Sequence, residues 1–256
     1  MNTISVITVV RNSVATIDNT IRSVAGQVYP HVEHIVIDGG STDGTRDVIE
    51  RHRDKIAVFE SEPDRGMYDA MNKGLRLATG DVVGFLNADD VYADSSVLEV
   101  ISQTIEGQKV DACYGDLVYF DKNNPDRIVR YWKSQSYRDG LFERGWMPAH
   151  PTFYAKKWIY DKYGGYDLAY RRQSDFELTV RFLAVHKIKS AYIPKVLVRM
   201  RSGGASRGLW HILEGNIEAY RACRKHALNV TPLFIAKKIL SRVPQFFHRD
   251  RFEASP

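Results

Sequence analysis

Hydrophobic positions along residues 1–90 alternate between two spacings. Runs of β-branched and other apolar residues predict short strands over 3–10, 32–38, 56–60 and 81–86. Between them, apolar residues recur every three or four positions, which predicts helices over 15–28, 43–52 and 67–78. Strands that alternate with helices of this length are typical of βαβ units, so the sequence predicts an α/β fold built on a parallel sheet.

Polar residues stand at the predicted carboxyl ends of three of these strands. Right-handed crossovers bring the carboxyl ends of parallel strands to one edge of a sheet, and ligands of open α/β sheets bind outside that edge. The residues expected there are Arg11, Asn12, Asp38 and the run Asn87-Ala88-Asp89-Asp90. We therefore expect these side chains to line one binding site.

The pattern is less regular after residue 90. It predicts helices over 97–106 and 176–186, strands over 112–120, 127–132 and 191–198, and an aromatic, proline-broken segment over 146–154. Beyond about residue 208 it predicts helices over 209–226 and 232–243. No linker separates these parts. We expect one domain over 1–204, with a nucleotide-binding half (1–90) and an acceptor half (91–204), followed by a helical tail over 205–256.

The net charge of +5 lies in that tail. Residues 1–204 carry 27 basic and 27 acidic side chains, whereas residues 205–256 carry 9 and 4. A neutral body is not typical of a nucleic-acid-binding protein, so nucleic acid is not an expected partner. In the second tail helix the residues expected on one apolar face are Leu233, Ala236, Ile239, Leu240 and Val243. Such a basic amphipathic helix either lies on an anionic membrane surface or packs on the body or on a second copy of the chain.

Features of a secreted or membrane-spanning protein are missing from the sequence. No apolar run approaches the length of a membrane span, and the N-terminus lacks the basic segment and cleavage site of a signal peptide. Cys113 and Cys223 have no metal-ligand spacing and are expected to be buried thiols. We expect a cytoplasmic protein, with the tail available for peripheral contact with the inner face of the cytoplasmic membrane.

Several motifs follow one another in an order that resembles the family 2 glycosyltransferases, which have the GT-A fold. They are ITVVRN at 7–12, VIDGGSTDGT at 36–45, RGMYDAMNKG at 65–74, GDVVGFLNADD at 80–90, GGYD at 164–167 and SDFELTVRF at 174–182. The segments NADD, YGD and HPTFY resemble bacterial enzymes that build exopolysaccharide, colanic-acid-like polymers or O-antigen. The resemblance implies a Rossmann-like, mainly parallel sheet flanked by helices. It also implies transfer of a sugar, with inversion, from a nucleotide-sugar donor that typically carries UDP to a glycan or lipid-linked glycan.

Two positions depart from the family pattern. Asn87 stands where the DxD motif begins with Asp, which leaves Asp89 and Asp90 as the anionic groups. The segment that reads Ala-Arg-Asn in many members is Ala70-Met71-Asn72 here, so its arginine is missing, and Arg65 or Lys73 is a candidate replacement.

Carboxylates are the groups expected to bind the metal, to act as the catalytic base and to contact the nucleotide base. Asp89 and Asp90 follow an apolar strand and could hold Mn²⁺ or Mg²⁺ against the diphosphate of the leaving group; the alternative is a helix cap. Asp175 matches the Asp of the family's acceptor-side signature, where one general base deprotonates the acceptor hydroxyl; the alternative is again a helix cap. By the same resemblance Asp38 accepts the imino N–H of the base, and its alternative is a turn residue.

Further candidates for substrate contact surround these carboxylates. They are Thr8, Val9, Arg11, Asn12, Arg65, Asn72, Asn87, Ala88, Asp89, His150, Arg199 and Arg201. His150 is expected in a shaped loop near the acceptor, or as a structural histidine. Arg199 and Arg201 are expected in a lid over the diphosphate, or in a solvated loop.

Other nucleotide-binding classes fit less well. The segment after the first strand, VRNSVAT, contains neither the GxGxxG of a dehydrogenase nor a P-loop. It also lacks the glycine-rich basic loop of a sugar-phosphate nucleotidyltransferase. A catalytically silent GT-A scaffold that binds a partner is the remaining alternative, and an oligomer is compatible with all of these readings.

Overall fold

The computed structural model describes residues 1–203, 209–240 and 245. Its strands are β1 (Ile4–Val10), β2 (Val32–Asp38), β3 (Val58–Ser61), β4 (Val82–Phe85), β5 (Asp90–Tyr92), β6 (Ala112–Asp121), β7 (Asn124–Trp132), β8 (Tyr154–Lys156) and β9 (Ser190–Arg201). Its helices are α1 (Ile17–Ala25), α2 (Thr45–Glu50), α3 (Met67–Leu77), α4 (Val97–Gly107), α5 (Lys157–Tyr163), α6 (Ser174–Thr179), α7 (Leu209–Lys225) and α8 (Leu233–Leu240). A π-helical segment, Val180–Val185, continues α6.

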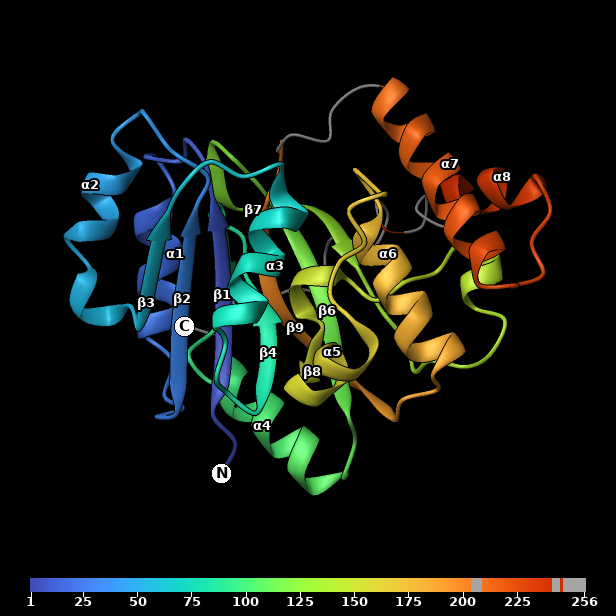
Figure 1. Cartoon of the computed structure of the whole chain (residues 1–256), viewed down its shortest axis with the longest axis horizontal. Coiled ribbons are helices and arrows are strands. Elements are labelled where there is room, and N and C mark those ends of the chain that lie inside the picture. The colour runs from blue at the N-terminus through green and yellow to red at the C-terminus, as the bar shows by residue number, and fades with distance from the viewer. Residues whose placement is uncertain (204–208, 241–244, 246–256) are drawn as a thin grey trace.

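The strands form one curled sheet in the order β3-β2-β1-β4-β8-β6-β9-β5, with β7 paired to β6 (Figure 1). The first four strands are parallel, as expected. The other half is mixed, because β8 runs antiparallel to both β4 and β6, and β5 runs antiparallel to β9. The sequence did not predict β5 or β8, since strands of three residues are too short to show a period of two.

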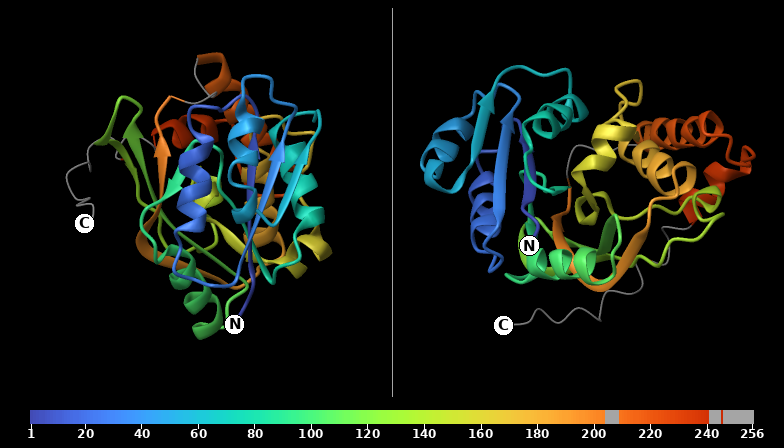
Figure 2. Two further views of the ribbon diagram at one scale, coloured as in Figure 1. Left: turned by 90° about the vertical axis from the view of Figure 1, so that its left-hand side faces the viewer. Right: turned by 60° about the horizontal axis from the view of Figure 1, so that its bottom comes forward.

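Helices cover both faces of the parallel half. Figure 2 shows α1 and α2 on one face and α3 on the other. Val10 packs with Ile17 on the first face, whereas Ile7 packs with Met71 on the second. Because neither face meets water, every residue of β1 is buried, which explains why only Ser5 and Thr8 interrupt its apolar run.

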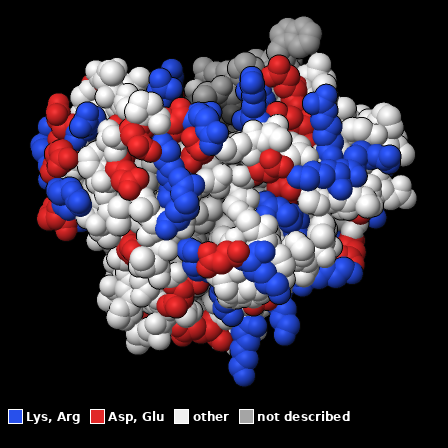
Figure 3. Space-filling view, viewed as in Figure 1, with Lys and Arg blue, Asp and Glu red and all other residues white. Residues whose placement is uncertain are grey.

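The tail packs on the body through α7 and α8, and Figure 3 shows both basic and acidic side chains in the region of α7. Helix α8 turns Phe234 and Lys238 inward, and Lys238 Nζ donates to Gln173 Oε1 at 2.9 Å. Its apolar residues Leu233 and Leu240 are 60% and 66% exposed. Lys238, which the sequence placed on the basic face, is 1% exposed, and its ammonium lies 3.8 Å from the centroid of the Phe176 ring. Residues 205–208, 241–244 and 246–256 of the expected tail, Val243 among them, lie outside the described residues.

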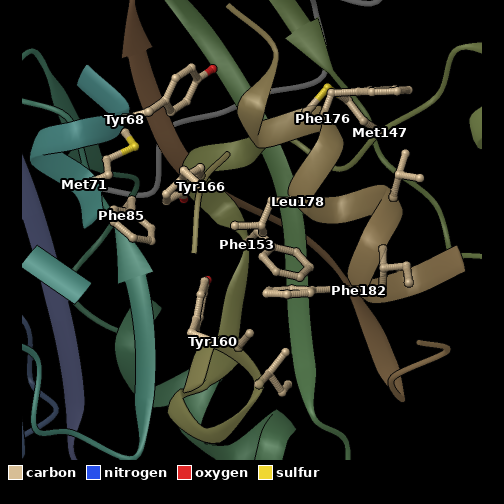
Figure 4. Packing of buried hydrophobic residues seen from close by; sticks show 14 of the residues in the cluster. Tyr68, Met71, Phe85, Met147, Phe153, Tyr160, Tyr166, Phe176, Leu178 and Phe182 are labelled. Atoms are coloured by element: carbon tan, nitrogen blue, oxygen red, sulfur yellow. The ribbon is translucent and has the colours of Figure 1, made fainter. Parts of the chain in front are cut away.

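Aromatic residues fill the space between the parallel half and α6. Figure 4 shows Tyr68 and Phe85 facing Tyr166, with Tyr160 beneath them. In a different core cluster the backbone of β4 approaches the ring of Tyr154 closely at Gly84, where an added Cβ would lie 2.0 Å from that ring. Cys113 and Cys223 are buried free thiols, as expected. Among the described residues, no helix combines the length and apolar character needed to cross a membrane.

Candidate active site

The carboxyl ends of β1, β2 and β4 meet at one edge, at the top of Figure 1. Val10 pairs with Asp38 across the parallel register of β1 and β2. On the other side of β1, the Leu86 N–H donates to Ile7 O at 3.0 Å, so Asn87 begins the segment beyond the edge. The expected convergence of the three polar clusters is confirmed.

Asn12 joins the loops that follow β1 and β2. It has a left-handed backbone, with φ 51°, its N–H donates to Ser41 Oγ at 2.8 Å, and its Oδ1 accepts the Thr42 N–H at 2.9 Å. Arg11, the residue before it, is exposed at the edge. Thr8 and Val9 lie below the edge inside the sheet, where Thr8 Oγ1 is 3.0 Å from His34 Nε2.

Asp38 lies at the edge but its carboxylate faces the protein. The side chain is 0% exposed, and it accepts hydrogen bonds from the Ser41 N–H, the Ser41 hydroxyl and the Ser61 hydroxyl. Two of these donors come from the loop after β2, and the third is Ser61, the last residue of β3. In this structure Asp38 therefore stabilises the turn after β2 and connects it to β3. A turn residue was the alternative to base binding that the sequence allowed for Asp38.

Asn87, Asp89 and Asp90 form an oxygen-rich corner between β4 and β5. Burial raises the pKa of Asp89, and Arg201 opposes that shift. Burial, followed by the charge of Asp89, raises the pKa of Asp90 well above its ordinary value. Asn87 Nδ2 donates to Asp90 Oδ2 at 3.3 Å, but buried Asn87 Oδ1 and Asp90 Oδ1 have no hydrogen-bond partner among the described residues.

A pocket of about 320 Å³ opens beside this corner. It is lined by the loop after β1, by Asp89 and by Arg201 at the end of β9. The structure thus brings three of the expected donor-site residues together: Asn12, Asp89 and Arg201. Ala88 is buried between the strand end and α1.

Four other residues expected to contact the substrate instead make hydrogen bonds within the protein. Arg199 donates to Pro125 O in the β6–β7 hairpin at 2.7 Å. Arg65 binds Asp69 in the first turn of α3, and Asn72 exchanges two 2.8 Å hydrogen bonds with the backbone of Tyr166. His150 is buried with Nε2 2.6 Å from the Tyr166 hydroxyl, and burial lowers its pKa. Both of the last two residues thus contact Tyr166, in the segment between α5 and α6.

Asp175 lies in the first turn of α6, after the N-cap residue Gln173. Its Oδ1 accepts the Phe176 N–H at 2.8 Å and the Tyr68 hydroxyl at 3.0 Å. No donor among the described residues contacts Oδ2, and the side chain is half-buried. Tyr68 belongs to the first turn of α3, so Asp175 stands at the same edge as the donor-site residues.

Three residues of this region were not predicted. Tyr68 has the spacing of a core residue in its helix, and Asp64 sits in the loop between β3 and α3 without a motif of its own. Glu218 of α7 accepts the backbone N–H groups of Arg171, Arg172 and Gln173, directly before Asp175. A carboxylate on a distant tail helix gives no sequence signal for such a contact.

Comparison with known proteins identifies the family. Residues 5–168 match the sequence profile described as glycosyl transferase family 2. The chain belongs to this family. An uncharacterized glycosyltransferase of Mycobacterium tuberculosis is 33% identical over 185 residues, which cover 70% of this chain and 68% of the relative. A PGL/p-HBAD biosynthesis glycosyltransferase of Mycobacterium bovis is 28% identical over 204 residues, covering 78% of this chain and 77% of the relative.

Solved structures confirm the GT-A fold of this glycosyltransferase. TarS 1–349 of Staphylococcus aureus in complex with UDP superposes with a TM-score of 0.65 at 18% identity, covering 97% of this chain and 72% of that one. A mannosyltransferase of Pyrobaculum calidifontis in complex with GDP-Man and Mn²⁺ superposes with a TM-score of 0.64 at 19% identity, covering 94% and 69%. The chain spans 44% of the longer TarS structure.

Proposed function

We propose that this glycosyltransferase moves a sugar, with inversion and with the help of a divalent metal, from a UDP-sugar to a growing cell-surface glycan. The observation that carries the proposal is the position of Asp175. Its Oδ2 is available to a substrate at the edge where Asn12, Asp89 and Arg201 meet. One carboxylate on the acceptor side and an oxygen-rich corner on the donor side are the groups that such a transfer needs.

In this mechanism Asp175 Oδ2 takes the proton of the acceptor hydroxyl. The acceptor oxygen then forms a bond to the anomeric carbon, and the bond from that carbon to the diphosphate oxygen breaks. The configuration inverts because attack and departure occur on opposite faces of the sugar. Tyr68 holds Oδ1, which leaves Oδ2 as the base.

The corner beside β4 fits a hard divalent cation. Asp89 and the unpartnered oxygens of Asp90 and Asn87 would hold Mn²⁺ or Mg²⁺, which prefer such ligands. The described residues contain no cluster of three His, Cys, Asp or Glu side chains able to hold a metal. Diphosphate oxygens and water would therefore complete the coordination shell. The bound cation would neutralise the charge that develops on the leaving diphosphate.

Relatives and neighbours support the substrate classes. UDP, UDP-GlcNAc and GDP-Man are bound in the neighbouring structures, one of them with Mn²⁺. Relatives include a putative teichuronic acid biosynthesis glycosyltransferase of Bacillus subtilis, 32% identical over 142 residues, covering 54% of this chain and 56% of that relative. We accordingly propose a glycan or lipid-linked glycan acceptor and a cytoplasmic enzyme whose tail contacts the membrane surface.

The test combines turnover, binding and stereochemistry. In Mn²⁺, Asp175→Asn should lower UDP release from the donor sugar by about 10²- to 10⁴-fold and leave UDP affinity unchanged. Asp89→Asn should abolish the Mn²⁺-dependent part of UDP binding in calorimetry. The glycosidic bond, read by NMR, should have the opposite anomeric configuration to the donor.

Asp161→Asn is the matched control, because Asp161 is an exposed carboxylate on α5 that pairs with Lys157. It should change none of these quantities. Full turnover by Asp175→Asn would overturn the role of the base, and a retained configuration would overturn the mechanism. Binding of a partner without any turnover in the wild-type protein would favour the silent scaffold.

A further inference from the structure

Lys238 of α8 is a buried cation that the proposed mechanism does not use. Its Nζ donates to Gln173 Oε1 at 2.9 Å and lies 3.8 Å from the centroid of the Phe176 ring. Burying a charge costs free energy, and an apolar side chain of similar size would pack beside Phe176 and Phe234 at a lower cost. The contribution of Lys238 is therefore expected in what its ammonium does to the residues that it contacts, and not in packing.

The two contacts of this ammonium lie on either side of Asp175. Gln173 is the N-cap residue of α6, two positions before Asp175. Phe176 directly follows Asp175, and its N–H donates to Asp175 Oδ1 at 2.8 Å. One ammonium thus holds a side chain that precedes the candidate base and the residue that binds one of its oxygens. Removal of the ammonium would loosen the direction in which Asp175 Oδ2 points.

The position of Lys238 depends on a glycine in the body. A Cβ built on Gly145 would lie 2.6 Å from both the Cα and the Cβ of Lys238, closer than real Cβ atoms approach such atoms. Helix α8 also contacts α7, which in turn contacts α6, and Figure 1 shows the three helices on the same side of the molecule. The absence of a side chain at position 145 therefore lets α8 come close enough for Lys238 to reach Gln173.

We propose that Lys238 is a positioning residue for the base Asp175, so that packing of α8 against Gly145 is required for full turnover. The inference rests on the proposed function, because it concerns the orientation of Asp175 in that reaction. Glu218 of α7 accepts backbone N–H groups of the same segment, whereas Lys238 holds its side chains. Helices α7 and α8 thus act on the reaction through the segment that carries Asp175.

The first test measures kcat, KM and melting temperature of the full chain carrying Lys238→Met. Methionine is apolar and unbranched, so it fills the site while Gln173 and Phe176 lose the ammonium. We expect kcat for UDP release from the donor sugar in Mn²⁺ to fall about tenfold, the effect of one hydrogen bond to a charged group. KM for the donor sugar should stay within about twofold, since donor binding is not involved. The melting temperature should stay close to that of the wild type, because an apolar side chain replaces a buried charge.

Lys162→Met is the control for the loss of a lysine. Lys162 is exposed on α5, and its ammonium also lies near aromatic rings, 5.9 Å from the centroid of Trp158 and 5.1 Å from that of Tyr163. It has no contact with the segment around Asp175 among the described residues. It should change neither kcat nor KM.

The second test uses a pair of glycine substitutions in one loop. Gly140 and Gly145 have φ values of 86° and 83°, but a Cβ on Gly140 would meet no atom within 4 Å. Both alanine variants therefore bear similar backbone strain, and only Gly145→Ala pushes against α8. We expect Gly145→Ala to lower kcat at least as much as Lys238→Met does, and Gly140→Ala to leave kcat unchanged. Lys238→Met should have no further effect in the Gly145→Ala protein, because the ammonium has already left Gln173.

Wild-type kcat in Lys238→Met would overturn the inference and leave the transferase proposal standing. Equal kcat in Gly140→Ala and Gly145→Ala would do the same, because strain and not the contact with α8 would then set the rate. A loss of UDP affinity in Lys238→Met that matches its loss of kcat would also overturn the inference, since it would indicate general disruption of the site. A wild-type protein that releases no UDP from any donor sugar would overturn both proposals.

Discussion

The hydroxyl of Tyr68 lies 3.0 Å from Asp175 Oδ1, so the first turn of α3 contacts the first turn of α6. Burial, and then the charge of Asp175, raises the pKa of Tyr68 well above its ordinary value. The phenol therefore stays protonated and acts as a donor to the carboxylate. One hydrogen bond thus connects the helix that begins at the donor edge to the candidate base.

Tyr68→Phe should separate positioning from binding. The ring would keep its stacking on Tyr166, at 5.4 Å between ring centroids, while Asp175 loses one donor. We expect kcat to fall about 5- to 10-fold, the effect of one ordinary hydrogen bond, with KM for the donor sugar unchanged. Steady-state UDP release measures both constants.

Tyr166→Phe is the comparison, because its hydroxyl bonds His150 instead of Asp175. Tyr166→Phe should lower the melting temperature, and it should lower kcat less than Tyr68→Phe does. If the two variants had the same kcat, the contact with Asp175 would have no positioning role.

Glu218 is expected to fix the segment that precedes Asp175. Its two carboxylate oxygens accept three backbone N–H groups, from residues 171 to 173, at 2.8 to 3.1 Å. Glu218→Gln replaces one of these oxygens with a donor, which leaves at least one buried or half-buried N–H without a partner. We expect kcat to fall about tenfold, with UDP affinity unchanged, because the segment before Asp175 relaxes.

Glu214→Gln serves as the control for Glu218. Glu214 lies one turn earlier on α7 and pairs with the Arg172 side chain near the surface. Its loss should leave kcat within twofold of the wild type, since exposed ion pairs contribute little. Equal effects of the two substitutions would show that general loosening of α7, and not the backbone contact, changes the rate.

Glu177 gives a stability prediction with a defined pH dependence. Burial alone would raise its pKa, but hydrogen bonds from His226 at 2.6 Å and Arg181 at 3.0 Å lower it overall. A carboxylate whose pKa is lower in the folded than in the unfolded state stabilises the protein above the unfolded value. That stabilisation disappears as the pH falls through the folded pKa, below 4.5.

Glu177→Gln should therefore lower the free energy of unfolding by about 3 kcal/mol at pH 7, because Glu177 is 1% exposed and its partners would remain buried. The difference from the wild type should shrink below pH 4.5. Urea unfolding at pH 7, 5, 4 and 3.5 measures it. A difference that is constant across this range would mean that packing, and not charge, is responsible.

The sequence predicted the half of the fold whose elements are long and regular. Strands β1, β2 and β4 and helix α3 follow from their apolar spacing, and their parallel order brings Asp38 and Asn87 to one edge as expected. The orientation of Asp38 could not be predicted, because Ser61, 23 residues away, reaches its carboxylate only after β3 pairs with β2. The contact of Asp64 with Gly39 could not be predicted either, because it depends on the path of a loop and on the absence of a Cβ at position 39.

Helix α8 shows a second limit of sequence patterns. The sequence predicted an apolar and a basic face and left open which of them packs on the body. In the structure Lys238, from the basic face, is buried, because Gln173 and Phe176 provide an acceptor and a ring on the body. Spacing shows that a helix has two faces, but the partners available in the fold decide which face turns inward.

The outward face of α8 is expected to bind an anionic membrane surface. Leu233 and Leu240 are exposed, Lys237 stands beside them, and the tail of residues 205–256 carries 9 basic and 4 acidic residues. Apolar contact and attraction to anionic lipid together support interfacial binding. The wild-type protein should sediment with phosphatidylglycerol vesicles at low salt, and less at high salt.

Leu233→Ser combined with Leu240→Ser should weaken this binding at least tenfold, because two leucine side chains no longer enter the lipid. Val28→Ser is the control, since Val28 is as exposed as Leu233 but lies after α1, on the parallel half. It should sediment like the wild type. If the double variant bound vesicles normally, or if it lost a dimer seen for the wild type in size-exclusion chromatography, α8 would be a protein contact instead. Because Phe234 and Lys238 hold the inner face of α8, the double variant should keep the melting temperature of the wild type, and lost binding can then be attributed to the outer face.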